Sequence, residues 1–262
     1  ESVTNSPGFK GLPSPFEFRQ HGQCGRWVSS VFPHMAGIAD ELAFLTSMTS
    51  TTNVHGLGSY MQNTGFTLPG FPCMGAWISY GLGRINKNLP EFVVLPDPNG
   101  LPYNNLGNFT AGFLPAKHQG TVIRVKGDTP INFLFPPKEA KHITPQSETD
   151  GLELLKSLNQ NYAQRFPHDS QLEARIESYE LAARMQLSAP EVFDLSKESQ
   201  AAKNLYGLGN KETSDFARRC MIGRRLLERD VRFVQIWSGA GGPTNNWDNH
   251  ANIHTELPHM AQ

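Results

Sequence analysis

The sequence contains no hydrophobic run long enough to cross a membrane. Its longest candidates, Phe92–Leu95 and Val231–Trp237, have only the length of β-strands. A membrane-spanning helix needs about 20 apolar residues. We therefore expect no transmembrane segment in this chain.

Cysteine is scarce, and neither sign of charge is in excess. Three cysteines without a Cys-x-x-Cys spacing define neither a disulfide framework nor a zinc knuckle, and we expect them to be buried apolar side chains. The 23 basic and 24 acidic side chains give a formal charge of −1, which provides no basic excess to neutralise phosphates. The composition therefore argues against a nucleic-acid partner and against a disordered polyelectrolyte.

Three motifs that identify enzyme classes are absent. No Gly-x-Ser-x-Gly sequence provides the nucleophile turn of the serine hydrolases. The glycines at Gly81 and Gly83 do not continue into a dinucleotide-binding Gly-x-Gly-x-x-Gly. Cys73 does not begin the Cys-x-Pro-Ser-Arg pattern of sulfatases with a formylglycine nucleophile. These absences exclude the simplest assignments to each of the three classes.

Glycine and proline are abundant, with 24 and 19 residues in a chain of 262, and they predict long ordered loops around a compact core. Between the loops, short apolar runs alternate with segments of three- and four-residue apolar periodicity. This alternation predicts an α/β layered fold with a mostly parallel sheet. The pattern predicts strands at 43–45, 92–95, 121–125 and 231–237, and helices over 25–42, 57–63, 72–80, 151–166, 169–187 and 214–228.

Several features of this pattern predict burial or exposure. The helical periodicity places Trp27 and Trp77 in the core. The loop-rich excursion over residues 96–145 is expected to lie over the carboxyl edge of the sheet and to shape substrate access, because long ordered excursions are often functional. Four arginines on the last helix are expected to form a solvated face, from which one could reach an anion: Arg218, Arg219, Arg224 and Arg225.

A carboxylate, two imidazoles and several amides lie close together after the strand at 231–237. Asp and His side chains suit zinc, manganese or iron(II). If the segment is helical, His250 and His254 share a face; if it is extended, Asp248 and His250 point the same way. The alternative is an exposed surface turn. The candidate residues of this cluster are Asp248, His250, Asn252 and His254.

A second polar cluster, Thr49–His55, supplies several hydroxyls and the imidazole of His55. A hydroxyl needs a base or a metal to react near neutral pH. Sites in parallel sheets collect beyond the carboxyl ends of the strands, and both clusters follow predicted strands. The alternative is that the Ser/Thr run is an ordinary loop or helix cap.

Several sequence blocks, present in the same order over nearly the whole chain, resemble one family. The blocks are Arg19–Gln23, Trp27–Ser29, Phe32–His34, Gly75–Gly83, Asn88–Leu95, Ser178–Ala182, Ser188–Glu191, Val231–Gln235 and Trp247–His250. The family is a bacterial, planctomycete-type group of sulfatase-like proteins, often exported with a twin-arginine signal, in the alkaline phosphatase/sulfatase superfamily.

The resemblance implies one domain over residues 1–262 with an alkaline-phosphatase-like α/β/α sandwich. It would contain the excursion at 96–145 and a helical stretch at 146–230. Members of the family begin with a strand whose Asp binds metal, and they continue beyond Trp247–His250 into a second Asp/His set. We therefore expect this chain to be an internal fragment, with a sheet and a ligand set that are incomplete at both ends.

The resemblance also implies a site that hydrolyses sulfate or phosphate esters with a divalent metal such as zinc, calcium or manganese. Thr51 or Thr52 would be the nucleophile, and Asp248 and His250 would be metal ligands. Additional site residues would be His55, Asn252 and His254.

The substrate implied by the resemblance is a small-molecule or polysaccharide ester, and the location is the periplasm or the cell exterior. Two alternatives keep the same fold. One is an exported binding or cell-surface protein without catalytic activity, and the other is a metal-dependent mutase or transferase.

Overall fold

A fully buried strand lies at the centre of a three-stranded parallel sheet. β3 (Phe92–Leu95) pairs with β4 (Thr121–Val122) on one side and with β5 (Phe233–Ile236) on the other. The computed structural model describes residues 13–125, 140, 142–166, 169–240, 247–249 and 252–261. The strand predicted at 92–95 is confirmed, and the strands predicted at 121–125 and 231–237 are shorter than expected.

The side chains of β3 alternate between two apolar clusters, one on each face of the sheet. Val93 and Leu95 pack with residues of α5 (Ser170–Phe193) and α7 (Ser214–Leu227), including Val192 and Met221. On the other face, Phe92 and Val94 pack with residues of α3 (Met74–Leu82) and η3 (Asn105–Phe109). Successive strand residues point to opposite faces, so a strand covered on both sides must be apolar throughout.

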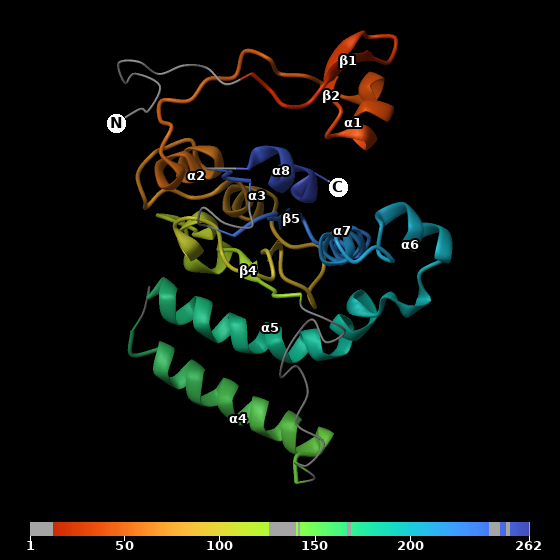
Figure 1. The fold of residues 1–262 in the computed structure, drawn as a ribbon. Coiled ribbons are helices and arrows are strands. Elements are labelled where there is room, and N and C mark those ends of the chain that lie inside the picture. Colours follow the sequence, from red (N-terminus) through yellow and green to blue (C-terminus); the bar gives the residue numbers. More distant parts are fainter. Residues whose placement is uncertain are drawn as a thin grey trace.

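Helices cover both faces of the sheet (Figure 1). α3 (Met74–Leu82) packs on one face with α2 (His55–Thr64) beside it, and α5 (Ser170–Phe193) and α7 (Ser214–Leu227) lie on the other. The α/β fold with a parallel sheet is thus confirmed at this level. The predicted helix ending at Gly65 is also confirmed, because this residue is the left-handed C-cap of α2.

A helical hairpin is added outside this layer. α4 (Pro145–Ala163) lies along α5 on the side away from the sheet (Figure 1). Its first turn is closed by Thr144 and Ser147, whose hydroxyls each accept a hydrogen bond from the other residue's backbone N–H. The Asp169 carboxylate caps α5 by accepting hydrogen bonds from the backbone N–H groups of Gln171 and Leu172, which confirms the predicted start of that helix.

The helix predicted over 25–42 and the strand predicted at 43–45 are wrong. The first of these segments instead contains β2 (Arg26–Ser29), which pairs antiparallel with β1 (Phe18–His21), and a one-turn helix, α1 (Pro33–Gly37). Gly22 and Gly25 adopt left-handed backbone angles in the hairpin turn, where the Asp40 carboxylate accepts two backbone hydrogen bonds. The apolar spacing fits a helix, but this turn chemistry favours a hairpin.

The predicted burial of two tryptophans is also wrong. Trp27 on β2 is 64% exposed and Trp77 on α3 is 46% exposed. Trp77 does lie on a helix, as predicted, but it points away from the sheet. There its ring contacts the rings of Tyr80 and Phe113 edge to face.

The three cysteines differ in burial. Cys73 is buried, Cys220 is half-buried and Cys24 is exposed, so the expectation of burial fails for Cys24. Burial raises the pKa of the Cys73 and Cys220 thiols, which keeps both groups protonated and unreactive near neutral pH.

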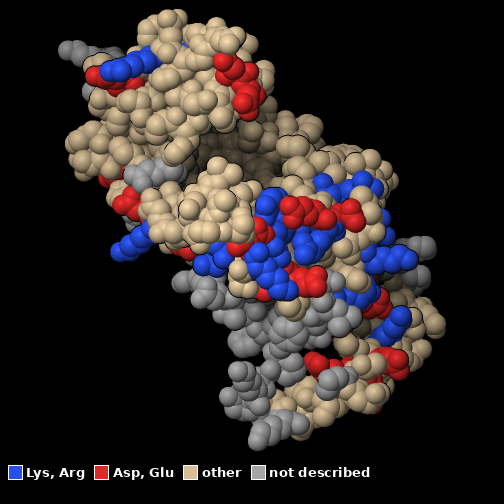
Figure 2. Space-filling model, turned by 90° about the vertical axis from the view of Figure 1, so that its right-hand side faces the viewer, with Lys and Arg blue, Asp and Glu red and all other residues tan. Residues whose placement is uncertain are grey.

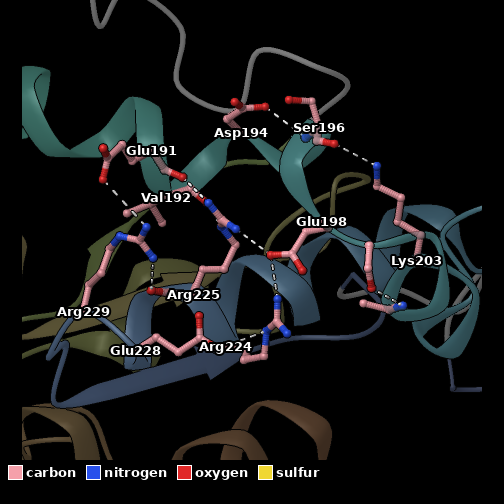
Figure 3. Close-up of polar contacts among 12 residues, drawn as sticks. Glu191, Val192, Asp194, Ser196, Glu198, Lys203, Arg224, Arg225, Glu228 and Arg229 are labelled. Atoms are coloured by element: carbon pink, nitrogen blue, oxygen red, sulfur yellow. Dashed lines mark hydrogen bonds and ion pairs between the residues drawn. The ribbon is translucent and has the colours of Figure 1, made fainter.

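The arginines of α7 do not form a simple solvated face, as the sequence predicted. Acidic and basic side chains do intermingle over α6 (Gln200–Tyr206), α7 and the carboxyl end of α5 (Figure 2). However, Arg225 is 9% exposed and donates to the carbonyl oxygens of Glu191 and Val192 at the end of α5 (Figure 3). Hydrogen bonds from Arg224 and Arg225 lower the pKa of the Glu198 carboxyl.

The remaining elements are short. They are η2 (Ala39–Glu41), η3 (Asn105–Phe109), η4 (Ala116–His118), η5 (Leu195–Lys197), α6 (Gln200–Tyr206) and α8 (Ile253–Met260).

No helix among the described residues is both long enough and apolar enough to span a bilayer.

Candidate functional site

A pocket of about 250 Å³ lies beyond the carboxyl end of β5. Three segments far apart in the sequence form its walls: the start of α2, the first part of the 96–145 excursion and the chain that follows β5. The lining residues are His55, Pro102, Tyr103, Trp237, Ser238, Gly239, Ala240, Trp247 and Asp248. The position agrees with the rule that sites in parallel sheets collect at the carboxyl ends of strands.

In this pocket, His55 of the Thr49–His55 cluster contacts Asp248 of the cluster that follows β5. Nε2 of His55 lies 2.9 Å from Oδ2 of Asp248. The His55 side chain is 52% exposed and the Asp248 side chain is 20% exposed, so the imidazole can be reached from solvent. The arrangement orients the imidazole ring, and it offers a nitrogen and an oxygen at one point of the pocket.

His55 is placed by the packing of α2, of which it is the first residue. Its ring stacks on Tyr103 with a centroid separation of 4.8 Å and an interplanar angle of 8°. The neighbouring Asn104 side chain donates to the carbonyl of Gly56. At the other end of α2, Gln235 of β5 donates to Oδ1 of Asn63 at 2.6 Å. The helix that carries His55 is therefore fixed to both the excursion and the sheet.

Asp248 is placed by its neighbour Trp247. The indole N–H of Trp247 donates to the Ser238 hydroxyl at 3.1 Å, and its ring stacks on Phe32 with a centroid separation of 6.5 Å. Residue 247 is therefore fixed next to the end of β5.

The threonines predicted as nucleophiles lie just before α2. Oγ1 of Thr52 accepts a hydrogen bond from the backbone N–H of Val54 at 3.1 Å, and Thr51 is exposed. Neither threonine lines the pocket. The local turn at Thr52 agrees with the alternative reading of the Ser/Thr run as loop chemistry.

The other residues predicted around Asp248 are dispersed. His250 lies outside the described residues. Asn252 is the N-cap of α8, with a left-handed backbone, and its carbonyl accepts hydrogen bonds from Thr255 and Glu256. His254 lies on α8 and is exposed. Because α8 begins at Ile253, the segment from Trp247 to His254 is not one continuous helix.

Among the described residues, no group of three or more His, Cys, Asp or Glu side chains could hold a metal ion. The contact between His55 and Asp248 is shorter than the roughly 3.3 Å that separates neighbouring ligands of a tetrahedral zinc ion with bonds of about 2.0 Å. The pair therefore supplies at most two ligand atoms, one nitrogen and one oxygen, and only if the two side chains move apart.

The sequence reasoning missed the walls of the pocket and the groups behind them. Tyr103, Trp237 and Ser238 line the pocket but were not singled out. Asp97 and Arg219 form a nearly buried ion pair behind it, with 3.5 Å between Oδ2 and Nη2. Burial lowers the pKa of the Arg219 guanidinium, and the Asp97 carboxylate opposes that effect. The position of Asp97, two residues after the predicted buried strand 92–95, was a signal for this pair.

A second cluster contains the residue types of a catalytic triad but lies at the other end of the sheet. The Ser79 hydroxyl donates to Glu91, which precedes β3, and lies 2.8 Å from Nδ1 of His118. Ser79 is 1% exposed, and it bridges the acid and the imidazole, whereas a triad places the imidazole between them. The cluster is therefore structural.

A larger groove of about 760 Å³ separates the N-terminal segment from α6 and α7, and it appears as the hollow in the upper half of Figure 2. Its walls are mostly apolar, as at Val31, Leu205 and Phe216. None of the residues predicted for a site lines it.

Comparison with known proteins gives one match. No curated protein and no solved structure matches the chain. One family model, described as "Protein of unknown function (DUF1501)", matches residues 2–262, and the chain therefore belongs to that family.

Proposed function

We propose that this chain provides part of a metal-dependent hydrolase site for sulfate or phosphate esters. The observation that carries the proposal is the 2.9 Å contact between His55 and Asp248. The two residues come from distant parts of the chain, and each lies in a segment singled out for its chemistry. The contact supports the expectation that the threonine-bearing turn and the Asp248 segment face each other.

The charge of the pocket is the physical reason for including a metal. Among the residues that the structure describes, its lining contains no Lys or Arg, and it contains the carboxylate of Asp248. An anionic ester would be repelled by that carboxylate unless a cation lay between them. A divalent ion neutralises the ester and lowers the pKa of a hydroxyl or water that attacks it. Zinc, calcium and manganese are the candidates.

The chain's own residues would have separate roles. His55 and Asp248 would hold the ion, with His250, Asn252 and His254 as candidates for further ligands. The hydroxyl of Thr51 or Thr52, three or four residues before His55, is the candidate nucleophile. Tyr103 and Trp247 would contact the alcohol part of the ester. The proposed substrate is an ester of a small molecule or of a polysaccharide.

The fold supports this proposal at a coarser level. A parallel sheet covered by helices on both faces is the core of an alkaline-phosphatase-like sandwich, and the pocket lies at the carboxyl edge where that architecture holds its site. The proposal therefore extends to an alkaline-phosphatase-like α/β/α sandwich as the fold and to the periplasm or the cell exterior as the location.

A second candidate function is ligand binding without catalysis. The observation that favours it is the aromatic lining of the pocket by Tyr103, Trp237 and Trp247. Such rings stack on flat or ring-shaped ligands and need no metal to do so. This candidate predicts ligand binding that persists after all metal has been removed.

Metal binding tests the proposal directly. The chain would be freed of metal with a chelator and titrated with Zn²⁺, Mn²⁺ or Ca²⁺ in a calorimeter, and hydrolysis of 4-nitrophenyl sulfate and phosphate would be followed with each ion. We expect His55→Ala and Asp248→Asn each to weaken metal binding roughly tenfold or more, because each removes one ligand.

The matched control is His259→Ala. His259 also faces a carboxylate, with 3.6 Å between its Nδ1 atom and Oε2 of Glu212, but it does not line the pocket. Its substitution should leave metal binding unchanged. Equal affinity in all variants, or a wild-type chain that binds no metal, would remove the basis of the proposal.

A further inference from the structure

A single carboxylate joins the carboxyl ends of β3 and β5. Asp97 follows β3, and its Oδ2 atom accepts a hydrogen bond from the backbone N–H of Gly239 at 3.0 Å. Its Oδ1 atom accepts one from the N–H of Asn99 at 2.9 Å. The Asp97 side chain is only 10% exposed. It therefore fixes the first residues after β5 against the first residues after β3.

A buried guanidinium completes this junction. Arg219 on α7 is 2% exposed. It donates to the carbonyl oxygen of Trp237, pairs with Asp97 and donates through Nε to the carbonyl of Asp215 at 3.3 Å. A buried charge is costly unless it is paired and hydrogen-bonded, so removal of either partner leaves the other in an unfavourable position.

The junction is continuous with one wall of the pocket. Ser238 and Gly239 line the pocket, and the Ser238 hydroxyl holds the indole N–H of Trp247. Trp247 directly precedes Asp248. The contacts thus run from Arg219 and Asp97 through the 238–240 loop to Trp247 and Asp248. Neither Arg219 nor Asp97 lines the pocket itself.

We propose that Arg219 and Asp97 are positioning residues, which hold the 238–240 loop so that Trp247 and Asp248 face His55. Their contribution to catalysis rests on the proposed function, whereas the placement of Trp247 can be measured without turnover or metal.

Arg225 provides a matched control on the same helix. It is also buried, but its hydrogen bonds go to Glu198 and to the carboxyl end of α5. Arg219→Met and Arg225→Met therefore both remove a buried charge from α7. Only the first substitution interrupts the contacts that lead to the pocket.

The experiment uses the complete chain labelled with 5-fluorotryptophan. The four tryptophans give separate fluorine resonances, which are assigned by replacing each with Phe. We expect the Trp247 and Trp237 resonances to shift or broaden in Arg219→Met, while those of Trp27 and Trp77 stay unchanged. In Arg225→Met, the Trp247 resonance should stay at its wild-type position.

Milder variants test the proposal if Arg219→Met does not fold. Asp97→Asn should move the same two resonances, and Arg219→Lys should restore them in part. Ser238→Ala, at a half-buried position, should shift Trp247 and leave Trp27 unchanged. A Trp247 resonance that is unmoved in these variants, or that moves equally in Arg225→Met, would overturn the inference.

Zn²⁺ titration of the same wild-type sample separates the two proposals. If the wild-type chain binds no metal but Trp247 responds to Arg219→Met, the positioning role stands and the hydrolase proposal fails. If metal binds and Trp247 does not respond, the positioning role fails alone.

Discussion

The backbone of Gly75 in α3 lies directly against the ring of Phe92 in β3. A Cβ atom at Gly75 would lie 2.5 Å from Cζ of Phe92, which is closer than any such contact in proteins. The absence of a side chain at this position allows α3 to approach the sheet.

This contact predicts opposite effects for two glycines of the same helix. Gly75→Ala should destabilise the protein by about 1–3 kcal/mol, because the added methyl group overpacks the core against Phe92. Gly81→Ala should stabilise it by about 0.5–1 kcal/mol, because nothing lies within 4 Å and alanine favours the helix. Urea unfolding measures both, and equal effects would contradict the close packing of α3.

The bonds of Arg225 predict a large loss of stability in Arg225→Ala. The substitution leaves the Glu198 carboxylate without one of its partners and frees two carbonyls at the end of α5. Breaking a buried pair in this way costs about 3–5 kcal/mol. Arg229→Ala is the control, because its ion pair with Glu191 is 3.8 Å long and more exposed, and should contribute less than about 1 kcal/mol. Urea unfolding that gave the two variants similar stability would disprove the role of Arg225.

The buried His118 predicts a dependence of stability on pH. Burial lowers the pKa of His118 below 6.5, although the Glu91 carboxylate opposes this effect. The unfolded chain therefore takes up a proton more readily than the folded chain, and stability should fall as the pH drops through 6.5 and below. Urea unfolding of His118→Gln should show a weaker pH dependence than wild type.

His34→Gln serves as the control for this measurement, because His34 is exposed. Its stability should change with pH as that of the wild type does. A His118→Gln variant with an unchanged pH dependence would show that His118 does not cause the effect.

The exposed face of Trp247 predicts a role in binding ring-bearing esters. If the proposed function is correct, Trp247→Ala should raise KM for an aryl ester roughly 2- to 10-fold, because stacking contributes about 0.5–1.5 kcal/mol. It should also lower kcat, because the Trp247 side chain positions Asp248. Trp27→Ala should change neither constant, because Trp27 does not line the pocket. Steady-state kinetics would contradict this role if both variants behaved alike, or if Trp247→Ala lowered kcat alone.

Local patterns in the sequence were sufficient to predict the layered core. The apolar run Phe92–Leu95 predicted a strand buried on both faces, and the cap at Asp169 predicted the start of α5. The N-terminal segment failed because its apolar spacing fits both a helix and a hairpin, and the turn at Gly22 and Gly25 decides between them. The wrong prediction that Trp27 is buried follows from that error, because it was based on the predicted helix.

The site could be predicted only in part. The residue types singled out His55 and Asp248 separately. The topology of a parallel sheet correctly placed the Asp248 segment, which follows β5, but the His55 segment was placed by a strand at 43–45 that does not form. That His55 would be the partner of Asp248 depends on how α2 packs against Tyr103 and Gln235, which no local pattern reveals. The arginine pattern on α7 likewise gave no sign that Arg219 points inward to Asp97.

The parallel pairing of β3 with β5 has a consequence for how the protein reaches its native state. Val93 pairs with Val234, so the two strands are separated by more than half of the chain. Closing such a large loop is slow, because its entropy is lost before the new contacts form. On the ribosome, α2 emerges long before the Asp248 segment is synthesised. The two halves of the pocket therefore meet late in folding. Any ligand that bridges them would bind only the native state and would stabilise it.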